Sequence, residues 1–415
     1  MQSVRNRHHQ LPRLNSMSAL LDRSPLSPIP DTPIGLPGQP WQPFHKSIMK
    51  ICRHPYVKSM LATVPMGITA GILGGPVQVV FILNLAALIP LVGLVTIAIA
   101  DLSLMTGRVL EELLKASVGN AIELAIGIVA MKRGHVHMAQ STLVGSMLCY
   151  TLLVPGSCFY LAGLSKEHLH FDHTLINIMS SLLMAVCMSL LVPTIMVTFP
   201  SLDTLSPQAS VTRQEIIFVS RGTAVTLLLL LGVFLLFQLK SHASIFHLAE
   251  ASSECSLGRQ KPNDHDGTEH QPTKIFAPQP AIVTLVAGMS CLIACVSFIV
   301  DSVNGFAQEL GLNTAFLTLV LVPLVGNSTR YAAIVTVALK GHVESAVRAN
   351  LNSTLRITLL VTPTLVILAW VSGLSMTLQL DTFEATMLFL AVVVMSHVIQ
   401  DGKSNYFEGL MLIGT

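Results

Sequence analysis

The sequence predicts an all-α polytopic membrane protein. Of its 415 residues, 52% are hydrophobic and only 11% are charged, and the mean hydropathy is +0.66. A soluble chain carries about a quarter charged residues, so this composition excludes an ordinary soluble fold. Apolar runs of about 18 residues or more recur, and a helix of that length crosses the core of a bilayer. A third observation, a polar cassette that occurs twice, indicates how the helices are arranged.

Two polar segments divide the chain. The N-terminal residues are rich in Pro, Ser, His and Arg without apolar periodicity, which predicts a disordered tail, and their basic charge favours a cytosolic N-terminus. A later stretch, which contains KPNDHDGTEHQPTK, predicts a cytosolic linker. The expected parts are the tail over 1–55, a first transmembrane helix over 56–76, five helices over 77–239, the linker over 240–278 and a second set of helices over 279–415.

About ten complete apolar segments lie between these polar parts. They fall at about 60–76, 77–100, 113–131, 139–163, 172–199, 216–238, 280–300, 313–338, 348–372 and 380–398. The final stretch, NYFEGLMLIGT, belongs to a further segment and is too short to cross a membrane alone. We therefore expect about eleven transmembrane helices, the last of them truncated.

The repeated cassette reads SVGNAIELAI in its first copy and LVGNSTRYAA in its second. The copies are 207 residues apart, the separation of Asn120 from Asn327, and the same offset aligns the tripeptides Gly-His-Val that begin at Gly134 and Gly341. This register indicates an internal duplication. Five expected spans separate the copies, an odd number, so the second copy crosses the membrane in the opposite direction. Inverted five-helix repeats are typical of secondary transporters, whose substrate sites lie near the midplane where the repeats meet.

Glu123 is the central candidate residue of the first cassette. A carboxylate deep in an apolar span costs about 3 kcal/mol and usually marks an ion or proton pathway. Its oxygens suit a hard divalent cation, and the same group can take a proton when the cation leaves. Asn120, one turn earlier, can add a carbonyl oxygen, and Gly119 permits close helix approach or a local break. The alternative is a carboxylate at a helix end that reaches the membrane interface.

Several other polar residues leave two interpretations open. Ser146 and Ser353 are related by the offset, but serines within membrane helices often bond their own backbone. Glu111 and Glu112 could collect cations at the mouth of a pathway or form a solvated face with Lys115. The scattered cysteines are interpreted as small buried hydrophobes, because they lack paired spacing.

At GNAIELAIGIVAMKRG the chain resembles the vacuolar-type calcium/proton exchangers of fungi and plants, within the calcium/cation antiporter superfamily. The resemblance continues through VPLVGN, AAIVTVALKGHVESA and IQDGKSNYFEG, and covers most of the chain from about residue 58. It implies a first helix followed by two inverted five-helix repeats, and proton-driven loading of calcium into the vacuole. The cation and proton site that it implies comprises Gly119, Asn120, Glu123, Ser146, Gly326, Asn327 and Ser353, with Glu123, Asn120 and Asn327 as the calcium ligands.

The chain also departs from this family pattern at polar positions. The second cassette of the family reads approximately GNAAEH, whereas this chain has Arg330 in place of the acid and Tyr331 in place of the histidine. Arg356 replaces a glutamine, Tyr150 stands in an expected Ser-Asn pair, and Lys115 ends a sequence EELLK that replaces GGLLN. We expect these five residues to modify the site.

Arg330 has the largest expected effect. In an inverted repeat it would face Glu123, and an arginine keeps its charge. A pair at ~4 Å and an effective dielectric near 20 attracts by about 4 kcal/mol, which would occupy the carboxylate oxygens needed for calcium. The alternative is that Arg330 points into a water-filled vestibule, in which case a single carboxylate still binds the cation.

The predicted function is calcium/proton antiport across the membrane of an acidic vacuole. The alternatives are a degenerate family member that regulates without transporting, and an exchanger with altered ion selectivity. Calcium, protons and the lipid bilayer are the expected partners, and no cofactor is expected. The net charge of +2 does not suggest a nucleic-acid partner. The sequence shows no nucleophile–base pairing, nucleotide loop or zinc spacing, so an enzyme is not predicted.

Overall fold

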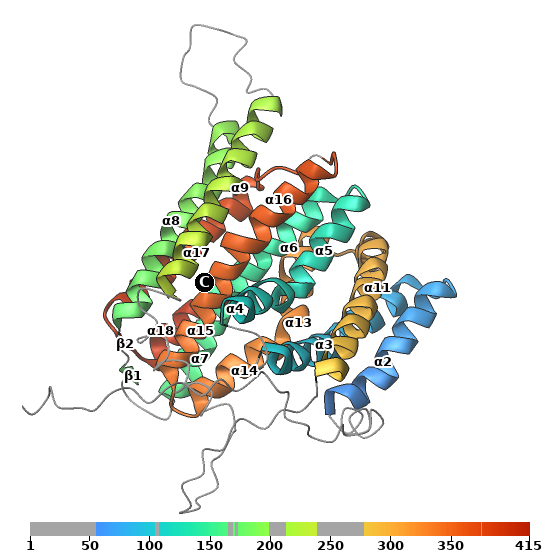
Figure 1. Ribbon diagram of the computed structural model, residues 1–415, viewed down its shortest axis with the longest axis horizontal. Helices are drawn as coiled ribbons and strands as arrows, with labels where there is room; N and C mark the ends of the chain where they lie inside the picture. The colour runs from blue at the N-terminus through green and yellow to red at the C-terminus, as the bar shows by residue number, and fades with distance from the viewer. Residues whose placement is uncertain are drawn as a thin grey trace, which may run out of the picture. The chain divides into compact units, whose positions relative to one another are not determined.

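The computed structural model describes residues 55–103, 108–164, 169–170, 173–198, 213–238, 278–374 and 376–415, all within one compact unit, Pro43–Thr415. The predicted tail over 1–55, except its last residue, and the predicted linker over 240–278, except Pro278, lie outside the described residues. The described chain is helical apart from one short strand pair, which confirms the predicted fold class (Figure 1).

The described residues of the first half form α-helices of different lengths, some joined by 3₁₀ or π-helical turns. In order they are α2 (Pro55–Ile72), α3 (Val77–Ser103), α4 (Arg108–Ser117), the 3₁₀ turn η1 (Val118–Asn120), α5 (Ala121–Lys132), α6 (Val136–Leu148), the π-helical turn η2 (Cys149–Leu153), α7 (Val154–Gly163), α8 (His173–Thr198) and α9 (Arg213–Leu236). Strand β1 (Leu169–His170) lies between α7 and α8.

The second half has a similar order of helices. It consists of α11 (Pro278–Leu310), α12 (Thr314–Phe316), the π-helical turn η4 (Leu317–Leu321), α13 (Val322–Gly326), α14 (Ser328–Leu339), α15 (Val343–Arg356), the π-helical turn η5 (Ile357–Val361), α16 (Thr362–Val371), α17 (Thr382–Gln400), strand β2 (Lys403–Ser404) and α18 (Tyr406–Gly414). Unlike in the first half, the strand follows α17, and a π-helical turn, η4, precedes the cassette. Strand β2 pairs antiparallel with β1, Leu169 opposite Ser404.

The number of membrane spans is close to the expected number. Within the described residues, eight helices are long and apolar enough to cross a membrane, and a ninth results if the bent pair Thr314–Gly326 and Ser328–Leu339 is one span. These nine match the apolar segments expected from 77 onwards. The apolar part of α2, Ala62–Ile72, is shorter than a full span, and α18 has nine residues. The total of eleven helices therefore stays a prediction.

The repeated Gly-His-Val tripeptides end two equivalent helices. Gly134 and Gly341 have φ values of 79° and 91°, which a residue with a side chain rarely adopts. In each case the next residue donates its N–H to a carbonyl in the last turn, His135 to Ala130 at 2.8 Å and His342 to Val337 at 3.3 Å. This is the hydrogen-bond pattern of a glycine C-cap, so the repeated tripeptide has a local structural cause.

Three π-helical turns precede prolines. Pro155, Pro323 and Pro363 each occupy the second position of the helix that follows η2, η4 or η5. A proline cannot donate the i→i−4 bond and its ring crowds the preceding turn, so a helix that continues through it widens locally. The prolines are plain in the sequence, but apolar periodicity did not predict the π-helical turns that precede them.

The hydrophobic residues form two cores, and each core contains residues from both sequence halves. One core contains parts of α2, α3, α5, α11 and α13, and α3 packs against both α2 and α11. The other joins α6 to α9 with α14 to α18. In the packing, α3 contacts α11, α8 contacts α17 and α7 contacts α18. The two sequence halves therefore interlock and do not form separate domains, although their relation as inverted repeats stays a prediction.

Candidate cation site

Both cassettes interrupt their helices at the asparagine. Asn120 ends the 3₁₀ turn η1 with φ −103° and ψ 40°, and Asn327 separates α13 from α14 with φ −96° and ψ 3°. The axes before and after Asn327 differ by 58°. Such breaks leave polar backbone groups inside the protein, which is tolerated at membrane depth where they line a site. The local break expected beside Gly119 is therefore present.

Glu123 lies in the first turn of α5, directly after the break, and is 1% exposed. Its Oε1 accepts a hydrogen bond from Asn327 Nδ2 at 2.7 Å and another from Ser146 Oγ at 3.3 Å. Asn327 Nδ2 also lies 3.3 Å from Ser146 Oγ. The other carboxylate oxygen, Oε2, is buried and has no hydrogen-bond partner. The carboxylate therefore points into the protein, where it contacts Asn327 of the second cassette and Ser146 of α6, and it does not reach the protein surface.

Arg330 does not bond to Glu123, and the expected ion pair between them is absent from the described structure. The Arg330 guanidinium donates to Asn120 Oδ1 at 3.0 Å, and Asn120 Nδ2 donates to the carbonyl of Ala116 at 2.7 Å. Asn327, one turn before Arg330, is the residue of the second cassette that bonds Glu123 Oε1. The Asn120 oxygen that was expected to bind calcium is bound to the guanidinium instead.

The Asn327–Glu123 and Arg330–Asn120 hydrogen bonds join equivalent positions of the two cassettes. The offset that relates Asn120 to Asn327 also relates Glu123 to Arg330. In one contact the asparagine of the second cassette meets the charged residue of the first, and in the other the asparagine of the first cassette meets the charged residue of the second. A carboxylate only accepts hydrogen bonds and a guanidinium only donates them. The two amides therefore present opposite ends, nitrogen to Glu123 and oxygen to Arg330.

The two cassette glycines differ in their surroundings. A Cβ atom on Gly326 would lie 3.2 Å from Ile122 of the first cassette, so this glycine permits the close approach of the two broken helices. The nearest atom to a Cβ atom on Gly119 would be the Leu114 carbonyl oxygen, 4.0 Å away. Gly145 of α6 meets η4 still more closely, because its Cβ atom would overlap the carbonyl of Leu319. No sequence pattern predicted this contact, because Gly145 lies outside the repeated cassettes.

Ser353 is not brought to the site, unlike Ser146. Its hydroxyl donates to the carbonyl of Ala349 in its own helix at 2.9 Å, which is the backbone alternative considered for both serines. Asn350, one turn earlier in α15, donates to the carbonyl of Tyr150 at 2.6 Å and is 1% exposed. The position of the second-repeat serine therefore does not mirror that of the first.

The other departures from the family pattern contact one another. The rings of Tyr150 and Tyr331 meet edge to face, with centroids 4.9 Å apart. Arg356 pairs with Glu112 at 2.7 Å, and Lys115 lies 3.8 Å from the other oxygen of Glu112. The predicted pairing of Lys115 is therefore present, but Glu112 is only 6% exposed and does not belong to a solvated face. Arg356 and Lys115 therefore both lie beside the carboxylate of Glu112.

The site offers few acidic ligands for a metal ion. Among the described residues, no group of three His, Cys, Asp or Glu side chains could hold a metal. A calcium ion takes six to eight oxygen ligands. Glu123 Oε2 is available, and the remaining oxygens would have to come from amides, backbone carbonyls at the breaks and water. The arrangement fits transient binding of a transported ion better than a permanent metal centre.

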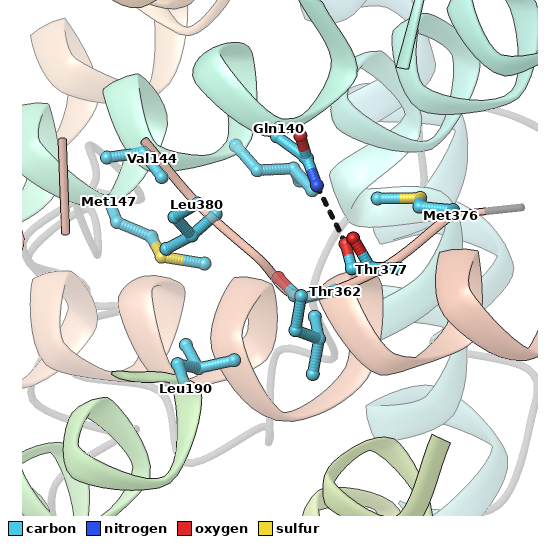
Figure 2. Close-up of a pocket in the computed structure, with 10 residues that line it drawn as sticks. Gln140, Val144, Met147, Leu190, Thr362, Met376, Thr377 and Leu380 are labelled. Carbon is cyan, nitrogen blue, oxygen red and sulfur yellow. Dashed lines mark hydrogen bonds between the residues drawn. The ribbon is translucent and has the colours of Figure 1, made fainter. Parts of the chain in front are cut away.

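The cavity in Figure 2 is separate from this site. It is lined by Gln140, Leu143, Val144, Met147, Leu190, Thr362, Met376, Thr377, Leu378 and Leu380. Gln140 Nε2 donates to the carbonyls of Thr377 at 2.7 Å and Gln379 at 3.0 Å, which fixes the segment before α17 against α6. The lining is mostly apolar and contains none of the predicted site residues, so the cavity is not the cation site.

Comparison with known proteins agrees with the description of a polytopic helical membrane protein. A family described as sodium/calcium exchanger protein matches residues 77–240 and 280–415. The vacuolar calcium ion transporter of Schizosaccharomyces pombe is 32% identical over 358 residues, 86% of this chain and 82% of the relative. Vacuolar cation/proton exchanger 2 of Arabidopsis thaliana is 30% identical over 344 residues, 80% of this chain and 73% of the relative. The chain belongs to the sodium/calcium exchanger protein family.

Solved structures show the same fold. The structure of native YfkE superposes with a TM-score of 0.67 at 24% identity and covers 86% of this chain and 96% of that chain. The H⁺/Ca²⁺ exchanger CAX superposes with a TM-score of 0.61 at 14% identity and covers 86% and 87%. At these identities the likeness concerns the fold, and the chemistry has to be argued from the residues of this chain.

Proposed function

We propose that this protein is a calcium/proton antiporter that loads calcium into an acidic vacuole. The observation that carries the proposal is Glu123, a buried carboxylate of the first cassette that Asn327 of the second cassette contacts and that keeps one oxygen unpartnered. Family membership and the names of the relatives support calcium and protons as the exchanged ions. The vacuolar membrane follows from the same relatives, and the basic N-terminal residues support a cytosolic N-terminus.

The geometry suggests how Glu123 exchanges its ligands. Oε1 is held by Asn327 and Ser146, while Oε2 can accept either a cation or a proton. Binding of both at once is disfavoured, because a proton removes the negative charge that attracts the cation. Since Asn327 comes from the other cassette, a movement of one repeat against the other changes the surroundings of Glu123. Such a movement couples the binding of a cation or proton at Glu123 to the opening of the site.

Calcium uptake into proteoliposomes with an acidic lumen tests the proposal. We expect the wild-type protein to take up calcium and to release protons, and we expect Glu123→Gln to abolish both fluxes without loss of folded protein. Glutamine keeps the shape and the Oε1 contacts but carries no charge. Uptake that equals that of empty liposomes for the wild-type protein would contradict the proposal.

A second candidate is a family member that has lost calcium transport or changed its ion selectivity. The observation that favours it is the Arg330–Asn120 bond, which puts a fixed positive charge where the family pattern has an acid. Under this candidate, Arg330→Glu creates or greatly increases calcium uptake, because the second carboxylate adds calcium ligands. Under the first candidate, the wild-type protein already transports, and the same change mainly alters affinity. Uptake by the two proteins side by side separates the candidates.

A further inference from the structure

A second buried carboxyl group lies at the start of α17. Glu384 is 4% exposed, and its Oε2 is buried without a hydrogen-bond partner. Its Oε1 accepts a bond of 2.5 Å from Ser141 Oγ of α6, and Ser141 is fully buried. Ser141 Oγ also lies 3.2 Å from Nδ1 of His137, one turn nearer the start of α6. His137 is exposed, so these three side chains connect the surface to a buried carboxyl group.

The chemistry of these groups fixes the direction of the hydrogen bonds. A serine hydroxyl has one proton, and the proton of Ser141 is donated to Glu384. Ser141 Oγ therefore accepts in its contact with His137, and His137 Nδ1 carries the proton. The order His137, Ser141, Glu384 is thus a continuous donor chain that points inward. Such a chain is a route for a proton toward the carboxyl group.

A purely structural role for Glu384 would use a different geometry. The sequence from Asp381 to Glu384 fits a capping box, in which the glutamate bonds back to the N–H of the capping residue. Asp381 does cap α17, and its side chain accepts from Phe383 N at 2.9 Å. Glu384 instead bonds across to α6 and leaves its second oxygen unsatisfied. A buried carboxylate without its full set of partners is costly, so this arrangement suits a group that is neutralised in part of a cycle.

The charged surroundings of Glu384 are simple. Among the described residues, the titratable groups whose charge acts on Glu384 are His137 of α6 and the exposed Asp381 before α17. Both helices begin here, α6 at Val136 and α17 at Thr382, so the three side chains lie near one end of both spans. Along α6, Ser146 follows Ser141 by five residues, which is about 7.5 Å of helix rise. Glu384 therefore lies between the end of the helix and the depth of Glu123.

We propose that Glu384 is a proton-binding carboxyl group of the transport cycle, loaded from the surface through His137 and Ser141. The imidazolium gives its Nδ1 proton to Ser141 Oγ, and Ser141 gives its own proton to Glu384 Oε1. The histidine becomes neutral, the serine is unchanged and the carboxyl group becomes uncharged, so one proton moves inward. The proposal depends on the proposed antiport function, and it adds a second proton-binding group to Glu123, which binds either the cation or a proton.

Two transport modes in the same proteoliposomes test this assignment. Calcium/proton exchange requires a proton carrier, whereas calcium/calcium exchange of labelled for unlabelled ion does not. For Glu384→Gln we expect calcium/proton exchange to fall by about 100-fold, the lower end of what a positioned proton-transfer group contributes. Calcium/calcium exchange by this variant should stay close to that of the wild-type protein. Equal loss of both modes, or wild-type rates in both, would overturn the assignment.

The histidine and a control acid sharpen the test. For His137→Gln we expect slower calcium/proton exchange that added imidazole restores, since the small base replaces the lost side chain. Ser141→Ala should slow exchange without rescue by imidazole, because the chain is broken beyond the histidine. Glu344→Gln, which removes another first-turn acid from a more exposed site on α15, should leave both modes unchanged. Absence of either mode in the wild-type protein would instead contradict the proposed function.

Discussion

At the scale of single residues, an asparagine amide can hydrogen-bond to a negative side chain in one cassette and to a positive side chain in the other. Asn327 turns its Nδ2 toward Glu123, and Asn120 turns its Oδ1 toward Arg330. Rotation of the amide exchanges a donor for an acceptor without a change of shape. A carboxylate at one position and a guanidinium at the equivalent position can therefore both be satisfied. The two cassettes can still close on each other although their charges differ.

This symmetry predicts opposite effects for the same substitution at the two positions. Asn120→Asp should be tolerated, because the new carboxylate pairs with Arg330. Asn327→Asp should be destabilising, because it places a second carboxylate beside Glu123 and removes the donor to Oε1. For each unit-charge pair at ~4 Å the effect is about 4 kcal/mol at an effective dielectric near 20. Thermal unfolding of both variants in detergent measures the difference.

The matched control for this pair is leucine at each position, which removes the amide without adding charge. Both leucine variants should be less stable than the wild-type protein, since each leaves a buried charged group without its partner. A lower melting temperature for Asn120→Asp than for Asn327→Asp would show that Arg330 and Glu123 do not have the roles described.

At the scale of elements, the broken helices depend on close contacts at glycines between the two sequence halves. Gly145 of α6 meets the carbonyl of Leu319 in η4, and Gly326 of α13 meets Ile122 of α5. Small residues let membrane helices approach closely, and that approach gives the packing that replaces hydrophobic association inside the bilayer. The position of Ser146, one residue after Gly145, is fixed by this contact.

We therefore expect Gly145→Ala to lower stability and to impair transport. The added methyl group has no space against the Leu319 carbonyl, so α6 or η4 has to move, and overpacking of this kind costs about 1–3 kcal/mol. Gly232→Ala in α9 is the control, since nothing lies within 4 Å of its Cβ position and alanine favours a helix. Equal melting temperatures for the two variants would contradict the close contact.

A second element-scale contact ties α4 to α15. The Glu112–Arg356 pair joins the two helices at 2.7 Å, and the Glu112 side chain is 8% exposed. Arg356→Ala should lower the free energy of unfolding by about 1–3 kcal/mol, because it leaves a buried carboxylate with only the more distant Lys115. Adding Glu112→Gln should recover part of this loss, which a double-mutant cycle measures.

The control for this prediction is the exposed pair between Arg133 and Asp301, whose side chains are 51% and 42% exposed. Arg133→Ala should cost about 0–1 kcal/mol, because solvent screens a surface ion pair. If Arg356→Ala were no more costly than Arg133→Ala, the α4–α15 contact would not contribute as described.

At the scale of the whole molecule, the two sequence halves share both hydrophobic cores. The Asn327–Glu123 and Arg330–Asn120 bonds and the Gly326–Ile122 contact all connect one half to the other. A movement that opens the site to one side of the membrane has to break or change these contacts. The site is thus formed by the association of the halves and not by either half alone.

This arrangement predicts that a covalent link between the cassettes stops transport. In a background without the native cysteines, Ile122→Cys with Gly326→Cys should be joined by a short thiol cross-linker, because the two side-chain positions are adjacent. Calcium uptake should fall after cross-linking, and reductive cleavage of the link should restore it. Each single-cysteine variant should be insensitive to the reagent. Full uptake by the cross-linked protein would show that the cassettes do not separate during transport.

The sequence by itself determined the features that depend on neighbouring residues. The apolar segments from 77 onwards, the breaks at the Gly-Asn pairs and the glycine caps at Gly134 and Gly341 all follow from local composition and backbone preference. The repeated cassettes also led to the prediction that Glu123 and Asn327 belong to one cation site, and the structure places their side chains in contact.

Only the tertiary structure decided which polar groups bond across the fold. The partner of Arg330, the separation of Ser353 from the site, the Glu112–Arg356 pair and the contact of Ser141 with Glu384 join residues far apart in sequence. Hydrophobic periodicity specifies that a helix forms and which residues it buries, but it does not specify the rotation and depth at which two helices meet. Those two quantities decide whether a buried charge finds an amide, an opposite charge or a hydroxyl group.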